Sequence, residues 1–340
     1  MSITRLSEIF KRFASVECNG SCSLYEFLSY QIAEDDELLS IAEVVPKGQP
    51  VPNLFFGAVH YLLLKGRQHP LRSYYPSITE SVGEMEDSFR YFKDFCLENK
   101  EDIISILKMK RVQTNEVRRC SYLYPSFNYI YELTNKPLAL IEIGTSAGLQ
   151  LFWDQYAYSY GTGEVIGNTS SNVHIQSEIK GDRKPFLSAK PAPVTMRTGV
   201  DLHIVDLSDS EEFLWLKALI WPSHHERLKL FEASGNFTKE QEVTLIEGDG
   251  VELLSKLVKE VPHDVTLCVF HTHVANQMPI DVRKRLFAII KEIGQERDVF
   301  HLYNNMKDGD LHLDYFIDGV ENTNTIAKTD GHGRWFTWLL

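Results

Sequence analysis

The sequence predicts an α/β fold in which a doubly wound sheet follows a helical domain. Apolar residues recur at three- and four-residue spacing up to about residue 135, as in amphipathic helices. Beyond Pro137, short β-rich runs alternate with helical stretches, which favours a sheet with helices packed on both faces. The chain has 340 residues, and at ~150 residues per domain this length predicts about two domains. We place them at residues 1–125 and 126–340.

The helical pattern of the first domain is clearest in residues 3–13 and 89–96, and proline and glycine mark its connectors. After residue 137, six β-rich runs are expected to be strands: LALIEIG, DLHIVD, VTLIEGDG, VTLCVFHTH, VFHLYNN and LHLDYFI. Helices are expected between them, over residues 211–221, 225–233, 251–260 and 281–295. Residues 160–199 are rich in Gly, Ser, Asn and Pro, and we interpret them as a long insertion.

Composition and charge narrow the classes of function. Hydrophobic residues make up 43% of the chain and charged residues 24%, as in an ordinary globular protein. No apolar run approaches the ~18 residues that cross a bilayer, and the N-terminus lacks signal-peptide features, so we expect a cytoplasmic protein without a membrane partner. The net charge of −12 repels a phosphate backbone and argues against nucleic acid as the main partner. The five cysteines are scattered without a C-x-x-C pair and are expected to be reduced.

The most informative segment is LALIEIGTSAGL, residues 138–149, in which an apolar strand leads through a turn of small residues into a helix. Gly144 and Gly148 allow the backbone to approach a ligand closely, and N–H groups at the start of the helix can hold a carboxylate or a phosphate. A tight strand-to-helix turn without a ligand has the same pattern. The segment therefore predicts where a site lies and leaves its ligand open.

This segment resembles the first motif of S-adenosylmethionine-dependent methyltransferases, E/D-x-G-x-G-x-G. It matches that motif at Glu142, Gly144 and Gly148, and departs from it at Ser146. The resemblance implies a Rossmann-like, methyltransferase-type sheet with S-adenosylmethionine as cofactor. In that family the turn wraps the methionine part of the cofactor, and acids after the next two strands hold the ribose and lie beside the adenine. The residues thus assigned to the cofactor are Glu142, Gly144, Thr145, Ser146, Gly148, Asp206 and Asp249.

The acid for the ribose is open between two positions. Asp206 ends the run DLHIVD, but it lies much farther from Gly148 than the ~20 residues of a simple βαβ unit, so the insertion has to separate them. Asp201, at the start of the same run, is the alternative. Either acid also fits a solvated strand end or a helix cap.

A longer set of segments extends the resemblance: QTNEVRR, EIGTSAGLQLFWDQY, RTGVDLHIVDL, ALIWPSHHERL, EGDG and GHGRWFTWL. Together they are similar to an uncharacterised bacterial family that is likened to methyltransferases. This resemblance covers most of the chain after about residue 110. It implies the fold and the cofactor-site residues, and it leaves the methyl acceptor, which we expect to be a small molecule, open.

The same turn also matches G-x-S-x-G, the nucleophile elbow of α/β-hydrolases, with Ser146 as the nucleophile. A hydrolase needs a later acid, for which Asp249 or Asp264 stands in the right chain order. After that acid it needs a histidine, and His273 or His332 stands in the right chain order. The upstream residues are predicted to be helical and contain no HGGG-like oxyanion segment, which favours the methyltransferase. A protein that keeps this fold without turnover is the third interpretation.

His271 and His273 lie two residues apart at the end of an apolar run, so both are expected on one face of the strand. No H-E-x-x-H pattern or clustered carboxylates supply further ligands, and we expect no metal site. Because open sheets bind ligands at the carboxyl ends of their strands, we expect one of the two histidines at the substrate mouth and the other to pack or to form a hydrogen bond.

The segment QTNEVRR, residues 113–119, is predicted to be a helix that leads into the sheet domain, with Asn115, Glu116 and Arg119 sharing one face. If that face lines the cleft, Glu116 can take a proton and Arg119 can hold an acidic group of the substrate. A solvated helix face with an internal ion pair is the alternative. The catalytic candidates are therefore His273, Glu116 and Asn115, and the expected substrate contacts are Arg119, His271 and His332.

Overall fold

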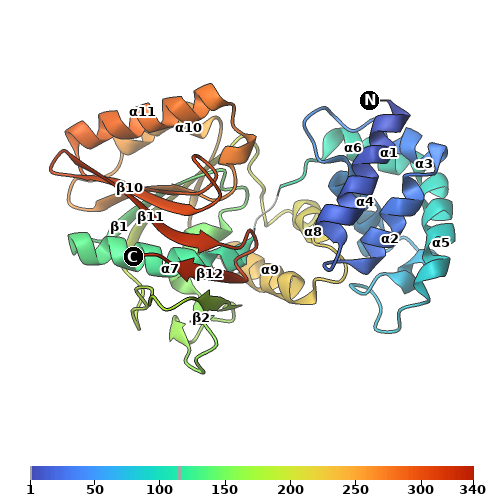
Figure 1. The fold of residues 1–340 in the computed structure, drawn as a ribbon, viewed down its shortest axis with the longest axis horizontal. Coiled ribbons are helices and arrows are strands. Elements are labelled where there is room, and N and C mark those ends of the chain that lie inside the picture. The colour runs from blue at the N-terminus through green and yellow to red at the C-terminus, as the bar shows by residue number, and fades with distance from the viewer. Residues whose placement is uncertain (1, 114–115) are drawn as a thin grey trace. The chain divides into compact units, whose positions relative to one another are not determined.

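The computed structural model describes residues 2–113 and 116–340 (Figure 1). The chain divides into two compact units, one of Met1–Thr114 with Ser208–Lys229 and one of Asn115–Leu207 with Leu230–Leu340. We call them the helical unit and the sheet unit. In the described part of the chain, no helix is long and apolar enough to cross a membrane. Asn115, one of the predicted catalytic residues, lies outside the described residues.

The helical unit surrounds one apolar helix, α4 (Val51–Leu64). Its sequence, VPNLFFGAVHYLLL, is apolar on all sides, and nearly all of its side chains are buried, as expected for a helix enclosed by others. The stacked rings of Tyr25 and Phe56 lie in the same core, with centroids 4.1 Å apart. The other elements are α1 (Ile3–Arg12), η1 (Phe13–Cys18), α2 (Ser23–Ile32), α3 (Asp36–Ala42), η2 (Pro70–Tyr74), α5 (Met85–Glu98), α6 (Lys100–Met109) and α8 (Ser210–Ala218). The helical pattern predicted for the first part of the chain is confirmed.

Helix α8 belongs to the helical unit although its sequence lies in the second half of the chain. Trp215 is buried in the helical core, and its Nε1 donates to the carbonyl oxygen of Arg111 at 2.8 Å. His60 of α4 contacts the carbonyl oxygen of Ala218 through Nδ1 at 2.9 Å. These contacts explain why residues 208–229 are part of this unit.

Within the described residues, a nine-stranded sheet forms the sheet unit, in the order β5-β12-β11-β10-β9-β8-β1-β6-β7. Strands β7, β6, β1, β8 and β9 run parallel, β10, β11 and β12 form an antiparallel extension, and β5 pairs parallel with β12. The strands are β1 (Leu138–Ile143), β5 (Glu178–Lys180), β6 (Val194–Asp201), β7 (Thr244–Glu247), β8 (Thr266–His271), β9 (Val299–Tyr303), β10 (Leu311–Ile317), β11 (Val320–Thr329) and β12 (Trp335–Trp338). The predicted α/β fold, with a large, mostly parallel sheet after a helical N-terminal part, is confirmed at this level.

Helices cover both faces of this sheet (Figure 1). On one face, Leu254 of α10 and Leu286 of α11 pack with Val269 of β8 in a single core. On the other face, Phe127 of α7 meets Phe270 of β8 edge to face, with ring centroids 5.2 Å apart. Every residue of β1 and β8 is buried, as expected for strands covered on both sides. The helices of this unit are α7 (Cys120–Thr134), α9 (His225–Thr238), which contains the boundary between the units, α10 (Gly250–Val258) and α11 (Ile280–Glu296).

Most predicted elements after residue 137 are confirmed, but the strand DLHIVD is wrong. Strand β6 ends at Asp201, where that strand was expected to begin, because residues 194–201 pair in parallel with β1. The end of the expected insertion at 160–199 is therefore a central strand of the sheet. Just before it, β2 (Ala157–Ser159), β3 (Ile166–Gly167) and β4 (His174–Gln176) form a small second sheet.

In the described part of residues 113–119, the predicted helix is also wrong. A 3₁₀ turn, η3 (Val117–Arg119), occupies its last residues, and α7 begins directly afterwards. Glu116 is extended, with φ −86° and ψ 100°, and its carboxylate accepts from the backbone N–H of Arg118 at 3.3 Å. An acidic residue in this conformation caps a helical turn rather than continuing one, so Glu116 and Arg119 do not share a helix face.

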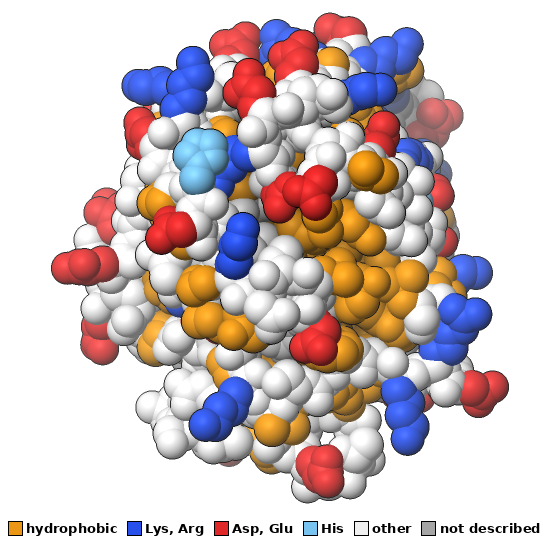
Figure 2. All heavy atoms as spheres, turned by 90° about the vertical axis from the view of Figure 1, so that its left-hand side faces the viewer, with side chains coloured by type: hydrophobic (Ala, Val, Ile, Leu, Met, Phe, Trp, Pro, Cys, Tyr) orange, Lys and Arg blue, Asp and Glu red, His pale blue; other side chains and the backbone are white. Residues whose placement is uncertain are grey.

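Figure 2 shows one face of the molecule, on which basic and acidic side chains are interspersed around an apolar area. On this face no basic side chains gather into a stripe. Because a phosphate backbone is bound by clustered Lys and Arg, this face does not offer that kind of surface.

Candidate functional site

The carboxyl ends of β1, β6, β8 and β9 lie at one edge of the sheet because these neighbouring strands run parallel. The chain continues from β1 to β6 on one side, whereas β8 lies on the other side of β1, so the strand order reverses between β1 and β8. In open α/β sheets, ligands bind at such a switch point. Residues 144–148, 272–274 and 304–305 follow β1, β8 and β9 at this edge.

The turn 144–148 contains three residues with left-handed backbone conformation. Gly144, Ser146 and Gly148 have φ values of 77°, 53° and 76°. Glycine adopts this conformation without strain, whereas at Ser146 it costs free energy, of order 1–3 kcal/mol. A short 3₁₀ helix, η4 (Leu149–Gln155), follows the turn.

Backbone hydrogen bonds tie the first part of this turn to β6. The N–H groups of Gly144 and Thr145 donate to the carbonyl oxygen of Val200, at 2.8 and 3.2 Å. The N–H of Ser146 donates to Oδ2 of Asp201 at 2.8 Å. Three consecutive N–H groups of the turn are thus bonded within the protein.

The two glycines of the turn also lie close to neighbouring side chains. A β-carbon on Gly144 would lie 2.6 Å from Cγ2 of Val274, and one on Gly148 would lie 3.2 Å from Cδ2 of Leu245. Val274 therefore fills the space beside Gly144 in this structure. A ligand that approaches the backbone at Gly144 requires Val274 to change its position.

The three acids considered for the cofactor lie in different surroundings. Asp201 ends β6 beside the turn, and burial raises the pKa of its carboxyl. Asp206 is exposed and lies in the loop beyond the strand. Asp249 is the N-cap of α10, where its Oδ1 accepts from the N–H groups of Val251 and Glu252 at 2.8 and 3.2 Å. Asp201 is bonded directly to the turn, because its Oδ2 accepts from the backbone N–H of Ser146.

Glu142 lies behind the turn. Its side chain is 3% exposed and its Oε2 lies 2.6 Å from Oγ1 of Thr145. Burial, and to a smaller extent the nearby Asp201, raises the pKa of Glu142 to about 8. Glu142 is therefore a neutral carboxylic acid at pH 7, which fixes the turn from within the protein.

A second polar group forms where residues 116–119 meet the turn 330–334. Glu116 is 4% exposed, and its Oε2 lies 3.3 Å from Nδ1 of His332. Asp330 accepts from the backbone N–H of His332 at 3.1 Å, and Arg119 donates through Nε to the carbonyl oxygen of Gly331 at 2.9 Å. A buried carboxylate beside a partly exposed imidazole is able to exchange a proton with a substrate.

Two side chains that the sequence analysis missed connect this group to the strand ends. Oγ1 of Thr272, directly after β8, donates to Oε1 of Gln150 at 2.9 Å. Nε2 of Gln150 donates to the carbonyl oxygen of Glu116 at 3.2 Å, and Nη1 of Arg119 lies 3.4 Å from Oγ1 of Thr272. We name Glu116, Arg119, Gln150, Thr272, His273 and His332 the polar cluster. Thr272 lies near the carboxyl end of the predicted strand VTLCVFHTH, and this position was the available signal for it.

His273 is held by the residues that follow β9. Its backbone N–H donates to Oδ1 of Asn304 at 2.8 Å, and its Nδ1 lies 3.1 Å from Nδ2 of Asn305. Its φ of 57° is left-handed, so the alternation of β8 does not extend to it. Burial, and then the neighbouring Arg119 and His332, lowers the pKa of His273 to about 3.

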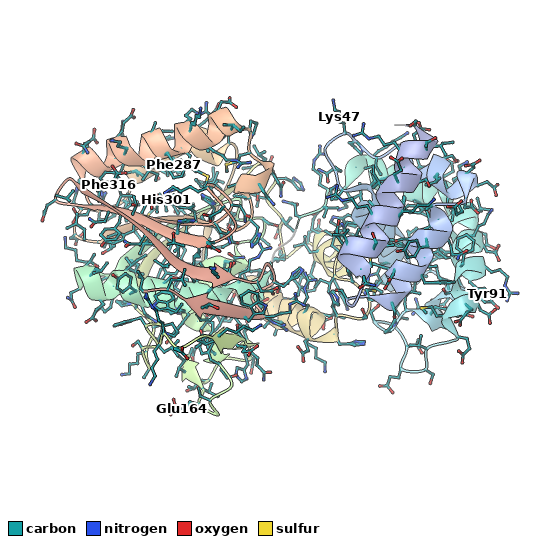
Figure 3. The ribbon with its side chains drawn as sticks, viewed as in Figure 1. Lys47, Tyr91, Glu164, Phe287, His301 and Phe316 are labelled. Atoms are coloured by element: carbon teal, nitrogen blue, oxygen red, sulfur yellow. The ribbon has the colours of Figure 1, made fainter. Side chains whose placement is uncertain are left out.

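His271 does not face the strand ends. It is fully buried, and its Nε2 lies 3.2 Å from Nε2 of His301. Figure 3 shows His301 and Phe287 near each other under α11, and their ring centroids are 6.0 Å apart. His271 is therefore the histidine of the pair that packs and hydrogen-bonds in the core, and this fully buried position does not fit its expected contact with a substrate. Across the described residues, no three His, Cys, Asp or Glu side chains are placed to hold a metal ion.

None of the residues named for a hydrolase forms a hydrogen bond with the Ser146 hydroxyl in the described part of the chain. Its Oγ is buried and has no hydrogen-bond partner among the described residues. Asp249 caps α10, and Asp264 is exposed before the start of β8, at the opposite end from His273. A nucleophilic serine needs a base within hydrogen-bond reach, and the structure shows none there.

A family model described as uncharacterized protein conserved in bacteria (DUF2332) matches residues 7–338. The match includes almost all of both units. No curated protein and no solved structure matches the chain. The resemblance to an uncharacterised bacterial family is thereby confirmed, while the reaction and the ligand have to be argued from the site.

Proposed function

We propose that this chain, which belongs to that family of uncharacterized proteins conserved in bacteria, is an S-adenosylmethionine-dependent methyltransferase that acts on a small molecule. The observation that carries the proposal is the position of Asp201. It ends the strand next to β1, and its carboxylate accepts from Ser146 in the glycine-containing turn. An acid at the end of this neighbouring strand is where the resembled methyltransferases hold the ribose. The ribose role is therefore assigned to Asp201 rather than to Asp206.

The strand order supports the same ligand position. Five adjacent parallel strands, β7-β6-β1-β8-β9, place the turn after β1 beside the switch point, where open α/β sheets bind nucleotide-like ligands. Leu202 follows Asp201 directly, and its side chain is 76% exposed. An exposed apolar side chain next to the ribose acid offers a surface for a flat heterocycle such as adenine.

The residues at the turn fit S-adenosylmethionine with one local change. Each carboxylate oxygen of Asp201 accepts one backbone N–H and keeps another lone pair that is able to accept from a ribose hydroxyl. Neutral Glu142 keeps the turn in place without adding a buried charge. Val274 has to shift for the methionine end of the cofactor to reach Gly144. The cofactor supplies an electrophilic methyl group, so the protein has to align a nucleophile and accept its proton.

The polar cluster supports the acceptor side of this proposal. Glu116 and His332 form a carboxylate–imidazole pair that is suited to receive a proton from the methyl acceptor. Arg119, only 6% exposed, brings a positive charge to the same place and favours an acceptor with an acidic group. These residues remove the proton and orient the acceptor.

Calorimetric titration with S-adenosylmethionine and S-adenosylhomocysteine tests the proposal. We expect micromolar binding that Asp201→Asn weakens by ~1–3 kcal/mol, as for a lost hydrogen bond to a charged group. Asparagine keeps an amide oxygen for the N–H of Ser146 and loses the bond that Oδ1 accepts from the backbone N–H of His203, an exposed residue. The matched control is Asp182→Asn, at an exposed position after β5, which is expected to leave the affinity unchanged. Absence of binding to folded wild-type protein, or equal losses in both variants, would contradict the proposal.

A negative titration makes the serine hydrolase the next candidate, since Ser146 has the strained backbone typical of a nucleophile elbow. Its test is labelling with a fluorophosphonate probe, which must be lost in Ser146→Ala. Cofactor binding without methyl transfer across a broad panel of small molecules would instead favour a binding protein with this fold.

A further inference from the structure

We propose that His273 is a neutral hydrogen-bond donor that binds an oxygen atom of an anionic group, carboxylate or phosphate, on the methyl acceptor. It does this through Nε2–H and is not the base of the reaction. That the bound molecule is a methyl acceptor rests on the proposed function. The protonation pattern of His273 follows from its own contacts and stands without it.

The backbone of His273 fixes the orientation of the Asn304 side chain. The backbone N–H of His273 donates to Asn304 at 2.8 Å, so the atom that receives it is the amide oxygen, Oδ1. The side chain of Asn305 lies 3.0 Å from the same oxygen. An oxygen that accepts requires a donor, so the atom of Asn305 at this position is its NH₂ group. The orientation of both amides is therefore fixed by the backbone of His273.

The orientation of Asn305 determines which nitrogen of the His273 imidazole carries the proton. The same NH₂ of Asn305 lies 3.1 Å from Nδ1 of His273. An amide NH₂ only donates, so Nδ1 has to accept with its lone pair. In a neutral imidazole, one nitrogen accepts and the other carries the proton. The proton of His273 is therefore on Nε2.

The Nε2–H of His273 donates to no other group among the described residues. Nε2 of His273 is buried and has no hydrogen-bond partner among the described residues. An unused buried donor costs ~1–3 kcal/mol, and the left-handed backbone of His273 adds a further cost of similar size. Such costs at one residue, next to the switch point of the sheet, are typical of a residue that is held ready for a ligand.

The charged groups around His273 keep it neutral. Arg119 on η3 and His332 on the turn 330–334 disfavour an added positive charge, and Asp330 on the same turn favours it. Burial is the largest influence, and together they lower the pKa of His273 to about 3. At neutral pH this residue therefore donates but does not take up a proton, which leaves proton removal to Glu116 and His332.

The neighbours of His273 define the group that it binds. The ring packs against the turn 330–334, where its Cε1 would lie 3.6 Å from a β-carbon on Gly331. The carbonyl oxygen of that same Gly331 accepts from Nε of Arg119. A neutral N–H donor and a guanidinium that meet at one segment are suited to an oxygen atom with negative charge. Carboxylate and phosphate share this chemistry.

Nuclear magnetic resonance of the full chain with ¹⁵N-labelled histidine tests the protonation pattern, with the His273 signals assigned from His273→Gln. We expect a protonated Nε2 and an unprotonated Nδ1, unchanged from pH 5 to pH 9. Asn305→Asp replaces the NH₂ donor by a carboxylate, so the proton is expected to move to Nδ1. Asn236→Asp, at an exposed position of α9, is the matched control and leaves the pattern unchanged. A proton on Nδ1 in the wild type, or titration near pH 6.5, would overturn the proposal.

Titration of the same sample with acetate and with inorganic phosphate, at constant ionic strength with chloride, tests the ligand. We expect a saturable shift of the Nε2 signal of His273 with one of the two anions, and the responding anion identifies the class of acidic group. His273→Phe, which removes the donor, is expected to weaken that binding by at least about fivefold. An equal response to chloride, or no response to either oxyanion, would overturn recognition of an anionic oxygen. Calorimetry with S-adenosylhomocysteine tests cofactor binding independently of these titrations. A failure of the proposed function is therefore distinguished from a failure of anion binding at His273.

Discussion

Replacing Glu142 by glutamine is expected to stabilise the protein at neutral pH. In the folded protein, burial raises the pKa of Glu142 from its ordinary value of 4.5 to about 8. The unfolded chain releases this proton near pH 4.5, whereas the folded protein retains it. Between these two values the unfolded state is therefore favoured increasingly as the pH rises. Glutamine has no proton to release and retains an oxygen that Thr145 can contact.

The size of the effect follows from the two pKa values. Each pH unit between them changes the free energy of unfolding by about 1.4 kcal/mol, so at pH 7 the variant is expected to be more stable by about 3 kcal/mol. Below pH 4.5 both states hold the proton, and this contribution of Glu142 disappears. Above pH 8 it reaches its full value and no longer grows.

Urea-induced unfolding at pH 5, 6, 7 and 8 measures this difference between wild type and Glu142→Gln. The control is Glu260→Gln, at an exposed position after α10, for which the difference from wild type should not depend on pH. A difference for Glu142→Gln that is constant from pH 5 to pH 8 would refute the reasoning, because it would mean that Glu142 is ionised in the folded protein.

Three further substitutions test contacts within the sheet unit, with unfolding in urea as the measurement in each case. Arg197→Met removes the two hydrogen bonds, both 2.8 Å long, that the guanidinium donates to the buried carboxylate of Asp154, and it is expected to cost about 3–5 kcal/mol; a loss below 1 kcal/mol would contradict a buried pair. Gly294→Ala places a β-carbon 2.2 Å from Cγ of Phe316 (Figure 3) and should destabilise by ~1–3 kcal/mol, although alanine favours helices; a gain in stability would show that Phe316 moves aside. Asp249→Ala removes the cap of α10 and should cost ~1 kcal/mol, a value that a cofactor role alone would not produce.

The sequence alone determined the class of fold and most elements of the sheet unit. Strands β1 and β8 are continuous apolar runs, and α10 and α11 carry one apolar stripe each, so their period and burial are visible locally. The turn after β1 was also predictable, because Gly144 and Gly148 stand directly behind an apolar strand. These features depend on residues within one segment.

The correct strand beside β1 was decided by the tertiary structure. Val200 pairs with Ile143, and this pairing makes residues 194–201 a central strand in spite of a polar sequence, VTMRTGVD, with little alternation. The apolar run DLHIVD is not a strand, because β6 ends at the edge of the sheet with Asp201, the first residue of that run. Helix α8 likewise belongs to the helical unit because Trp215 is buried in the core of that unit. Strand pairing joins distant residues, and no local period encodes it.

The side-chain contacts of the candidate site were decided in the same way. His273 was predicted from its position after a strand, but its protonation depends on Asn304 and Asn305. Those residues reach it because β9 lies beside β8 in the sheet. Glu116 was predicted on a helix face and instead meets His332 from the far end of the chain. The sequence determined which reactive groups the protein carries, whereas only the packing of strands decided which of them touch, because hydrogen-bond partners are set by distance in space and not by spacing along the chain.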